Sequence, residues 1–424
     1  MNNGTTNEPS GARPAGDNRR RAGAVAAPGR TMSRRELIRR AGLWTAGLAI
    51  PPAVLAACGT ADDANSADTG SGTDSSGSAG EATDTPPAAA GSDAGSTIKV
   101  ATYGGFFEEN FRELYPRFTE ETGIAVESIP EPDDSEWVVQ LQQAAQSGTT
   151  LADVSILNNI SLQRGIKGDI IHSYNIANVP NSQYLADGFV VTGTDDDVVG
   201  IGALSWYYTL VSNTEKVPES PTSWATLWDP IWNNQLALMT GPYPSFLLDI
   251  TAATWYPGEG MLDTQAGIEE VMRKLAELKP NVKLWWRDES TAQPDYNSGE
   301  VSIGQFFHDI ASYAADEGEP LRSVFPTEGA VLDSGLWAIS STTAAPEASV
   351  AFIDWMCRPA IQEELALTLG TSPTVAKEHM DLTDEDYEAI SGPGPEAAIQ
   401  PNFGIYEEWE SWVNEKWAEL IYAG

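Results

Sequence analysis

Cysteine and histidine are scarce in this chain of 424 residues, which contains two cysteines and three histidines. Two cysteines, Cys58 and Cys357, are too few for a disulfide framework. Cys357 follows the apolar, helix-like run 351–356, where we expect it to be a small buried side chain. No group of histidine, cysteine and acidic residues has the spacing of a zinc site. The sequence therefore predicts neither a metal nor any other cofactor.

The sequence also lacks the motifs that mark common enzymes. It contains neither the Gly-x-Ser-x-Gly of a nucleophile elbow nor the Gly-x-x-x-x-Gly-Lys-Ser/Thr of a phosphate-binding loop. The acidic pair Asp288-Glu289 is adjacent in the sequence, so by itself it does not define the opposed carboxylates of a glycosidase. We therefore predict that the chain is not an enzyme, with a hydrolase as the weaker alternative.

Positive charge is rare after residue 57. The formal net charge is −37, although residues 1–57 contain nine arginines and only three acidic residues. An acidic surface repels nucleic acid phosphates and anionic lipids, and it attracts cations. The sequence therefore predicts no nucleic acid partner, and the charge fits either a cationic ligand or a solvated surface adapted to salt. The run Asp195-Asp196-Asp197 fits a solvated loop better than a calcium site.

The apolar run near the N-terminus, residues 41–57, is interrupted by Pro51-Pro52 and is short for a membrane-spanning helix. The pair Arg34-Arg35 precedes it, and small residues end it, as in a signal exported by the twin-arginine route. The run stops at Leu-Ala-Ala-Cys58, which resembles a bacterial lipobox, whose cysteine is acylated. We predict a lipoprotein signal peptide over 1–57 and lipid attachment at Cys58. The alternative is an uncleaved anchor with an incidental cysteine.

Residues 58–96 contain almost no large apolar side chain. A stretch of Ser, Gly, Ala, Asp, Thr and Pro cannot bury enough surface to fold, so we predict a disordered tether. As a random coil it would reach roughly 35 Å. Together with the lipid, such a tether would hold a folded body at the outer face of the cell membrane.

From residue 97 onward, short β-runs alternate with helical patterns. Residues 98–103, 124–129 and 153–157 have the character of strands, and 108–122 and 137–147 have helical spacing of apolar residues. The pattern resumes with strands at 237–240, 301–306 and 336–339, helices at 268–278, 346–356 and 361–369, and a Trp-rich terminal helix at 406–421. This alternation predicts an α/β fold with mainly parallel sheets, in which ligands bind beyond the carboxyl ends of strands.

Several short segments between residues 98 and 373 carry a resemblance to a known family. They include Tyr-Gly-Gly-Phe-Phe at 103–107, Phe-Thr-Glu-Glu-Thr-Gly-Ile at 118–124, Pro-Thr-Ser-Trp-Ala-Thr-Leu-Trp-Asp-Pro at 221–230, Phe-Pro-Thr-Glu-Gly-Ala at 325–330 and Ala-Phe-Ile-Asp-Trp at 351–355. In this order and spacing they resemble the spermidine/putrescine-type extracellular solute-binding proteins of ABC importers. The resemblance implies a membrane permease as partner and a small-molecule ligand held between two lobes.

The resemblance also implies how the chain is divided. Two α/β lobes of the periplasmic-binding-protein type would be joined by a hinge and would close around the ligand. Lobe 1 would begin with residues 97–212, lobe 2 would hold 213–326, and 327–424 would return to lobe 1 and add the C-terminal helices. We expect a monomer.

The same resemblance assigns ligand-binding roles at the predicted strand ends. A polyamine site needs carboxylates for the ammonium groups and aromatic faces for the methylenes. The residues implied are Tyr103, Phe107, Asn158, Trp206, Tyr243, Phe307, Asp309, Asp333 and Trp337. Only two of them are acids, fewer than polyamine binders of the family use, and a usual aspartate position falls on Gly335.

The ligand therefore stays open between a polyamine, such as putrescine or spermidine, and a smaller monocation or amino-acid-like zwitterion. Arg287 is a candidate to hold a ligand carboxylate. Trp285, Trp286 and Trp337 fit a hydrophobic core as well as a ligand platform. A surface sensor that keeps the fold but does not serve transport is the remaining alternative.

Overall fold

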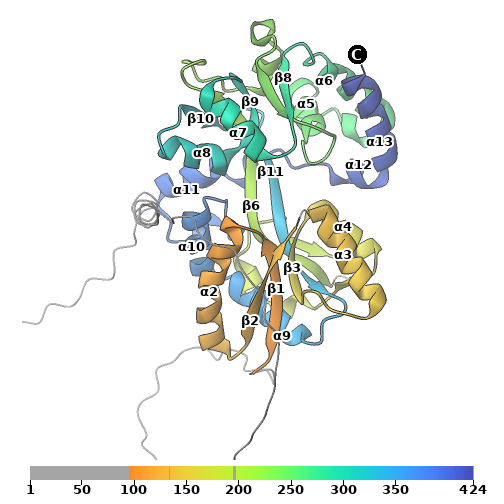
Figure 1. Ribbon diagram of the computed structural model, residues 1–424, viewed down its shortest axis with the longest axis vertical. Helices are drawn as coiled ribbons and strands as arrows, with labels where there is room; N and C mark the ends of the chain where they lie inside the picture. Colours follow the sequence, from red (N-terminus) through yellow and green to blue (C-terminus); the bar gives the residue numbers. More distant parts are fainter. Residues whose placement is uncertain (1–94, 133, 194–196, 424) are drawn as a thin grey trace, which may run out of the picture.

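The computed structural model describes residues 95–132, 134–193 and 197–423, which form two lobes stacked along the long axis of the molecule (Figure 1). The predicted signal peptide, Cys58 and nearly all of the predicted tether lie outside these residues, as do Asp195 and Asp196. Because the two lobes share strands, the described strands form one 11-stranded sheet in the order β2-β1-β3-β11-β6-β9-β7-β8, with β4, β5 and β10 attached at its sides.

Lobe 1 contains the N-terminal strands and the helices that cover them. Its strands are β1 (Thr97–Tyr103), β2 (Ala125–Glu131), β3 (Val154–Asn158), β4 (Ile171–His172) and β5 (Val190–Thr192). Its helices are α2 (Phe106–Thr122), α3 (Asp134–Ser147), α4 (Asn159–Lys167), α9 (Pro346–Met356) and α10 (Pro359–Leu369), with short 3-10 turns at Ile176–Asn178 and Pro180–Tyr184. Strand β1 pairs in parallel with both β2 and β3, which confirms the predicted parallel pattern here.

Local sequence sets the ends of these helices. Helix α2 ends where Gly123 adopts a left-handed conformation with φ 76°, and its N–H bonds to the carbonyl of Thr119. Helix α4 begins where the Asn158 side chain accepts a hydrogen bond from the backbone N–H of Ser161. The carboxyl end of β3 therefore runs directly into α4, and this places Asn158 at the edge of the lobe.

Two long strands pass from one lobe to the other. They are β6 (Val198–Asn213) and β11 (Val331–Ser340), which pair antiparallel from Val331 opposite Tyr208 to Trp337 opposite Ile201. Near one end β11 pairs with β3 of lobe 1, and near the other end β6 pairs with β9 of lobe 2. The ribbon shows both strands crossing the waist of the molecule (Figure 1).

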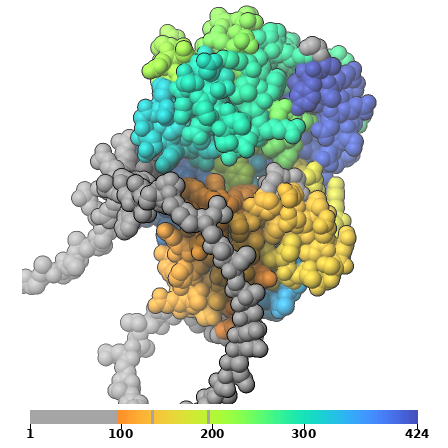
Figure 2. All heavy atoms as spheres, in the orientation of Figure 1, coloured from red at the N-terminus to blue at the C-terminus, as the bar shows by residue number. Residues whose placement is uncertain are grey.

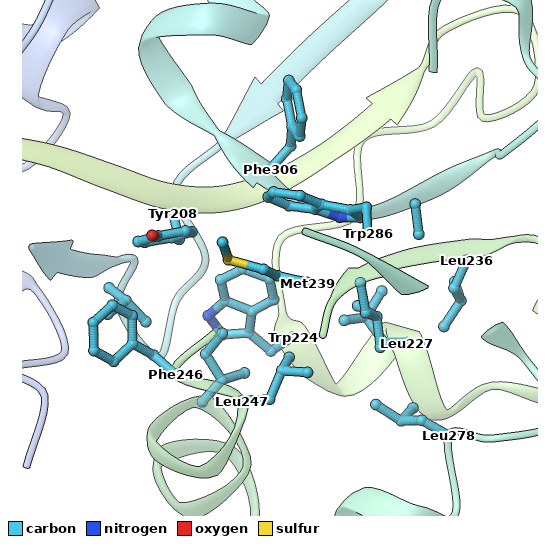
Figure 3. Packing of buried hydrophobic residues seen from close by; sticks show 14 of the residues in the cluster. Tyr208, Trp224, Leu227, Leu236, Met239, Phe246, Leu247, Leu278, Trp286 and Phe306 are labelled. Carbon is cyan, nitrogen blue, oxygen red and sulfur yellow. The ribbon is translucent and has the colours of Figure 1, made fainter. Parts of the chain in front are cut away.

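Lobe 2 is built around three strands that continue the sheet. These are β9 (Ile303–Phe307), β7 (Leu236–Met239) and β8 (Val282–Trp286), with β10 (Leu321–Val324) on the side of β6. Its helices are α5 (Leu247–Trp255), α6 (Gln265–Ala276), α7 (Glu289–Ser298) and α8 (His308–Asp316), with short 3-10 turns at Trp224–Trp228, Pro230–Trp232 and Met261–Asp263. Figure 3 shows the core of this lobe, in which Trp224, Met239 and Trp286 lie one above the other.

The last part of the chain returns to lobe 2. Helix α11 (Asp384–Ser391) lies between two short 3-10 turns, at Lys377–His379 and Pro395–Ala397. It is followed by α12 (Phe403–Glu408), α13 (Glu410–Trp417) and a π-turn at Ala418–Tyr422. Tyr406, Val413 and Trp417 are buried in the same hydrophobic cluster as Trp224. The single helix predicted over 406–421 is therefore two helices and a π-turn, and it packs on lobe 2.

Lobe 2 was predicted to span residues 213–326, and strands β6 and β11 carry the chain between the lobes. Asn213 is the far end of β6 inside lobe 2, where it pairs with Leu321. The chain crosses between the lobes inside β6, near Trp206, and recrosses at the start of β11. Every residue of β6 except Trp206 is buried, and the strand continues without interruption from Val198 to Asn213.

Candidate ligand-binding site

A cleft of about 670 Å³ lies where the two hinge strands meet the inner ends of both lobes. Its size falls within the range of about 300–1,000 Å³ that is typical for small-molecule sites. Eight of the nine predicted site residues line it: Tyr103, Phe107, Asn158, Trp206, Tyr243, Phe307, Asp309 and Asp333. The structure therefore brings together residues that are more than 200 positions apart in the sequence.

Asp333 is the most buried acid of the cleft, with 3% of its surface exposed. Its Oδ1 accepts hydrogen bonds from the backbone N–H of Ser334 at 2.9 Å and from Nδ2 of Asn159 at 3.3 Å. Burial raises the pKa of Asp333 to about 7, although both hydrogen bonds act in the opposite direction. A cationic group in contact with Asp333 would offset the free-energy cost of burying its negative charge.

Two further acids enter the cleft from lobe 2. Asp309 lies in the first turn of α8 directly after β9, and Glu289 begins α7 directly after β8. Both act, together with Asp333, on the buried hydroxyl of Tyr208, whose pKa is raised first by burial and then by these three carboxylates. All three acids thus line the same cleft and act electrostatically on Tyr208, in the interior of β6.

Aromatic rings form the lobe 1 wall of the cleft. The ring of Tyr103, at the end of β1, lies edge-on to Phe107 at 6.0 Å and to Trp206 at 6.2 Å. Gly335 makes room for this arrangement, because a Cβ atom at that position would lie 2.5 Å from Ile156 and 3.2 Å from the Tyr103 hydroxyl. An aspartate at residue 335 would be excluded for the same reason.

Aromatic rings also form the lobe 2 wall. Phe307, at the end of β9, lies 4.7 Å from the ring of Tyr208. Tyr243, in the loop after β7, packs 5.4 Å from Phe246 and 5.7 Å from Tyr406. The cleft thus presents aromatic faces from both lobes around three carboxylates, which is the chemistry that holds protonated amines and their methylene chains.

Trp337 is the one predicted site residue that the structure places elsewhere. It is fully buried in the lobe 1 core, with its ring 5.5 Å from Phe111 and 5.3 Å from Phe352. Trp286 is likewise a core residue. Trp337 stands four residues after Asp333 on β11, which corresponds to roughly 13 Å along a strand, and α2 and α9 cover it there.

Several cleft residues were missed or only considered as alternatives. Arg287, weighed as a carboxylate ligand, does line the cleft, and Glu289 two residues later lines it as well. Thr371 enters from the segment after α10, and the C-terminal helices add Asn414, Trp417 and Tyr422. Arg287 and Glu289 follow the end of strand β8, so a search of strand ends could have found them. Residues 414–422 lie in helices and a π-turn, and nothing in the sequence indicates that they reach the cleft.

Within the described residues, no cluster of His, Cys, Asp and Glu is arranged to hold a metal ion. Cys357 is fully buried, and burial raises the pKa of its thiol. Among the helices that the structure describes, none has the length and apolar character needed to cross a bilayer.

Comparison with known proteins identifies a matching family. A family model described as bacterial extracellular solute-binding protein matches residues 113–389. This range includes both hinge strands, strands β7 to β10 of lobe 2 and six of the eight predicted residues that line the cleft, but neither Tyr103 nor Phe107. The description is of a binding protein and agrees with the expectation that the chain is not an enzyme.

Individual relatives agree with this match. The chain is 31% identical over 153 residues to the spermidine/putrescine-binding periplasmic protein of Salmonella typhimurium, which is 36% of this chain and 42% of the relative. It is 25% identical over 181 residues to the gamma-aminobutyric acid-binding protein of Pseudomonas aeruginosa, covering 41% and 49% of the two chains. The chain thus spans less than half the length of these curated relatives.

A solved structure covers nearly all of the described body. The substrate-binding protein of a spermidine/putrescine ABC transporter from Streptococcus pneumoniae aligns with a TM-score of 0.64 and 23% identity, over 77% of this chain and 98% of that one. This likeness confirms the predicted two-lobe fold of the periplasmic-binding-protein type.

Proposed function

Because the chain belongs to the bacterial extracellular solute-binding protein family, we propose that it captures a small solute with a protonated amine between its lobes. The solute then passes to the permease of an ABC importer. The observation that carries this proposal is the convergence of Asp309, Asp333 and Glu289 around Tyr208 in an aromatic cleft. Closure of the two lobes around the amine would exclude water from the charged contacts and strengthen them.

Polyamines are the first ligand class that we propose. Three acids, two of them at least partly buried, suit a dication whose methylene chain lies against Tyr103, Trp206 and Phe307. The names of the Salmonella relative and of the Streptococcus structure point to the same class. Putrescine and spermidine are therefore the first compounds to test.

An ω-amino acid is the second candidate, and one residue favours it. Arg287 brings a guanidinium to the cleft, and a guanidinium binds a carboxylate with two parallel hydrogen bonds. The Pseudomonas relative is named for gamma-aminobutyric acid. Replacement Arg287→Gln separates the two ligand classes, because it should weaken binding of a zwitterion at least tenfold while leaving a diamine unaffected or bound more tightly.

Thermal denaturation of the purified chain tests the proposal as a whole. A ligand present at 100 times its Kd stabilises a protein by about 2.7 kcal/mol, which corresponds to a clear rise in Tm. We expect at least one of putrescine, spermidine, gamma-aminobutyric acid and a quaternary amine to raise the Tm. If all four compounds leave the Tm unchanged at millimolar concentration, the amine hypothesis is wrong.

We also propose that Cys58 carries a lipid that holds the body near its permease. The support is the sequence Leu-Ala-Ala-Cys58 at the end of an apolar run behind paired arginines. Replacement Cys58→Ser should move the protein from the membrane fraction to the soluble fraction of cells. Persistent membrane attachment of the variant would instead indicate an uncleaved anchor.

A further inference from the structure

Residues 402–423, which we call the C-terminal segment, are fixed to lobe 2. Tyr406, Val413 and Trp417 are each no more than 3% exposed within the lobe 2 core. The buried carboxylate of Asp249, on α5 of lobe 2, accepts hydrogen bonds from the Tyr406 hydroxyl at 2.5 Å and from the backbone N–H of Asn402 at 2.7 Å. The C-terminal segment must therefore move with lobe 2.

The same segment also reaches lobe 1. Arg164 and Lys167, on α4 of lobe 1, form ion pairs with Glu410 and Glu407 at 2.7 Å each. Ile160 of α4 is 3% exposed and belongs to the hydrophobic cluster of lobe 2. Figure 1 shows α12 directly above α4 across the waist, and Figure 2 shows the blue C-terminal segment beside the yellow part of lobe 1.

The C-terminal segment also forms one side of the ligand cleft. Asn414, Trp417 and Tyr422 line it, and the Tyr422 hydroxyl lies 2.6 Å from the hydroxyl of Thr240, after β7. A smaller cavity of about 120 Å³ between α4 and the segment shares Asn414 with the main cleft and is lined by both Arg164 and Glu410. The Arg164–Glu410 ion pair therefore borders this smaller cavity, which lies next to the ligand site.

These contacts depend on how far apart the lobes are. A segment that is anchored in lobe 2 keeps its ion pairs with α4 only while the lobes are close together, because ion pairs of this kind extend to about 4 Å. The family match ends at residue 389, so it assigns no role to the C-terminal segment. We propose that the C-terminal segment is an interlobe latch, which holds the cleft closed through Arg164–Glu410 and Lys167–Glu407 and covers the smaller cavity beside it.

The latch depends on the proposed function in one respect, namely that a closed cleft would retain the bound solute. All four charged side chains are between 29% and 58% exposed, so each pair should contribute modestly and be weakened by salt. We expect the loss of one pair to increase the ratio of open to closed molecules by about 1.5- to 5-fold. Because each pair shifts the equilibrium between open and closed molecules only modestly, the cleft can both capture and release a solute.

The test measures the distance between the lobes in the absence of any ligand. Fluorophores placed on Val139→Cys, on α3 of lobe 1, and on Ile231→Cys, in lobe 2, report closure in the full chain carrying Cys58→Ser. Val139 and Ile231 are 49% and 64% exposed, and the remaining Cys357 is fully buried. This readout does not depend on identifying the solute, so a failed ligand panel and a failed latch are distinct results.

Charge reversal then isolates the ion pairs. Lys167→Glu alone and Glu407→Lys alone should each shift the ligand-free chain toward a longer interlobe distance, and the double swap should restore the original distance. The matched control is Arg117→Glu, because Arg117 pairs with Glu364 at 2.7 Å with similar exposure but entirely inside lobe 1. The latch is refuted if the single reversals leave the distance unchanged, or if Arg117→Glu produces the same shift.

Discussion

At the scale of single residues, the raised pKa of Asp333 makes ligand affinity depend on pH. Its pKa in the ligand-free protein is about 7, whereas an unfolded aspartate titrates near 3.8. A cation binds the ionised form, so affinity should rise between pH 5 and pH 7 and level off above pH 8. Calorimetric titration of putrescine should show a loss approaching tenfold per pH unit on the acidic side.

Replacing the carboxylate tests whether Asp333 is the source of this profile. Asp333→Asn should weaken amine binding at pH 8 by more than tenfold and make the affinity independent of pH between 5 and 8. The control is Asp316→Asn, an exposed aspartate at the other end of the helix that carries Asp309. An unaltered pH profile in Asp333→Asn would assign the titration to another group.

Trp206 and Trp337 were both predicted from the sequence to bind the ligand, and substitutions at the two positions should have different effects. Trp337→Leu removes part of a fully buried ring in lobe 1 and should cost about 2–4 kcal/mol of folding free energy with less than a threefold change in ligand affinity. Trp206→Leu changes a half-buried ring that lines the cleft, and its larger effect should be on ligand affinity. Denaturant unfolding and calorimetry measure the two quantities; a strong binding defect in Trp337→Leu with intact stability would contradict its placement.

The sequence was a good guide to most residues that line the cleft, because the parallel strands of each lobe end there. Tyr103 and Phe307 are the last residues of their strands and Asp309 follows one, so their convergence could be expected without coordinates. It was a poor guide to Trp337, because a sequence does not say how far along a strand the cleft extends. Gly335 shows why the usual acid position is vacant here, since its neighbours Ile156 and Tyr103 leave no space for a side chain.

At the scale of whole elements, helices with clear stops were predicted well and the hinge was not. Helix α2 was expected to end at Gly123, and it does. Strand β6 contains Gly200, Gly202 and Asn213 and shows no apolar–polar alternation, because it is buried along nearly its whole length as it passes through both lobes.

The attachment of α12 through Asp249 should also respond to pH. Burial raises the pKa of Asp249 to about 6, above the unfolded value of 3.8. A group raised in this way favours folding most below pH 4, and this contribution is lost as the pH rises through 6. Asp249→Asn removes the buried charge, so it should add about 1–3 kcal/mol of stability at pH 7.5 and nothing near pH 4.

Urea unfolding at the two pH values measures this difference. Tyr406 can reorient its hydroxyl to accept from the new amide, whereas the Asn402 N–H can keep its acceptor oxygen. Loss of stability at both pH values would show instead that the carboxylate is required as a double acceptor. The matched comparison is Asp263→Asn, whose side chain is exposed in the same lobe.

At the scale of the whole molecule, acidic charge and two-lobe geometry combine. The net charge of −37 should raise the local concentration of cations around the cleft, and this effect weakens with salt. Strands β6 and β11 form the hinge between the lobes. The C-terminal segment lies on lobe 2, whereas β1, the first strand of the folded body, lies in lobe 1 (Figure 1). Elements from both ends of the folded chain therefore line the cleft.

A crystal structure of the protein grown with saturating putrescine or gamma-aminobutyric acid tests the central claim most directly. We predict one bound molecule between the lobes, with its amine nitrogen about 2.7–3.2 Å from a carboxylate oxygen of Asp309 or Asp333 and its methylenes against Tyr103 or Phe307. An empty cleft with both compounds, or an amine bound only outside the cleft, would contradict the account.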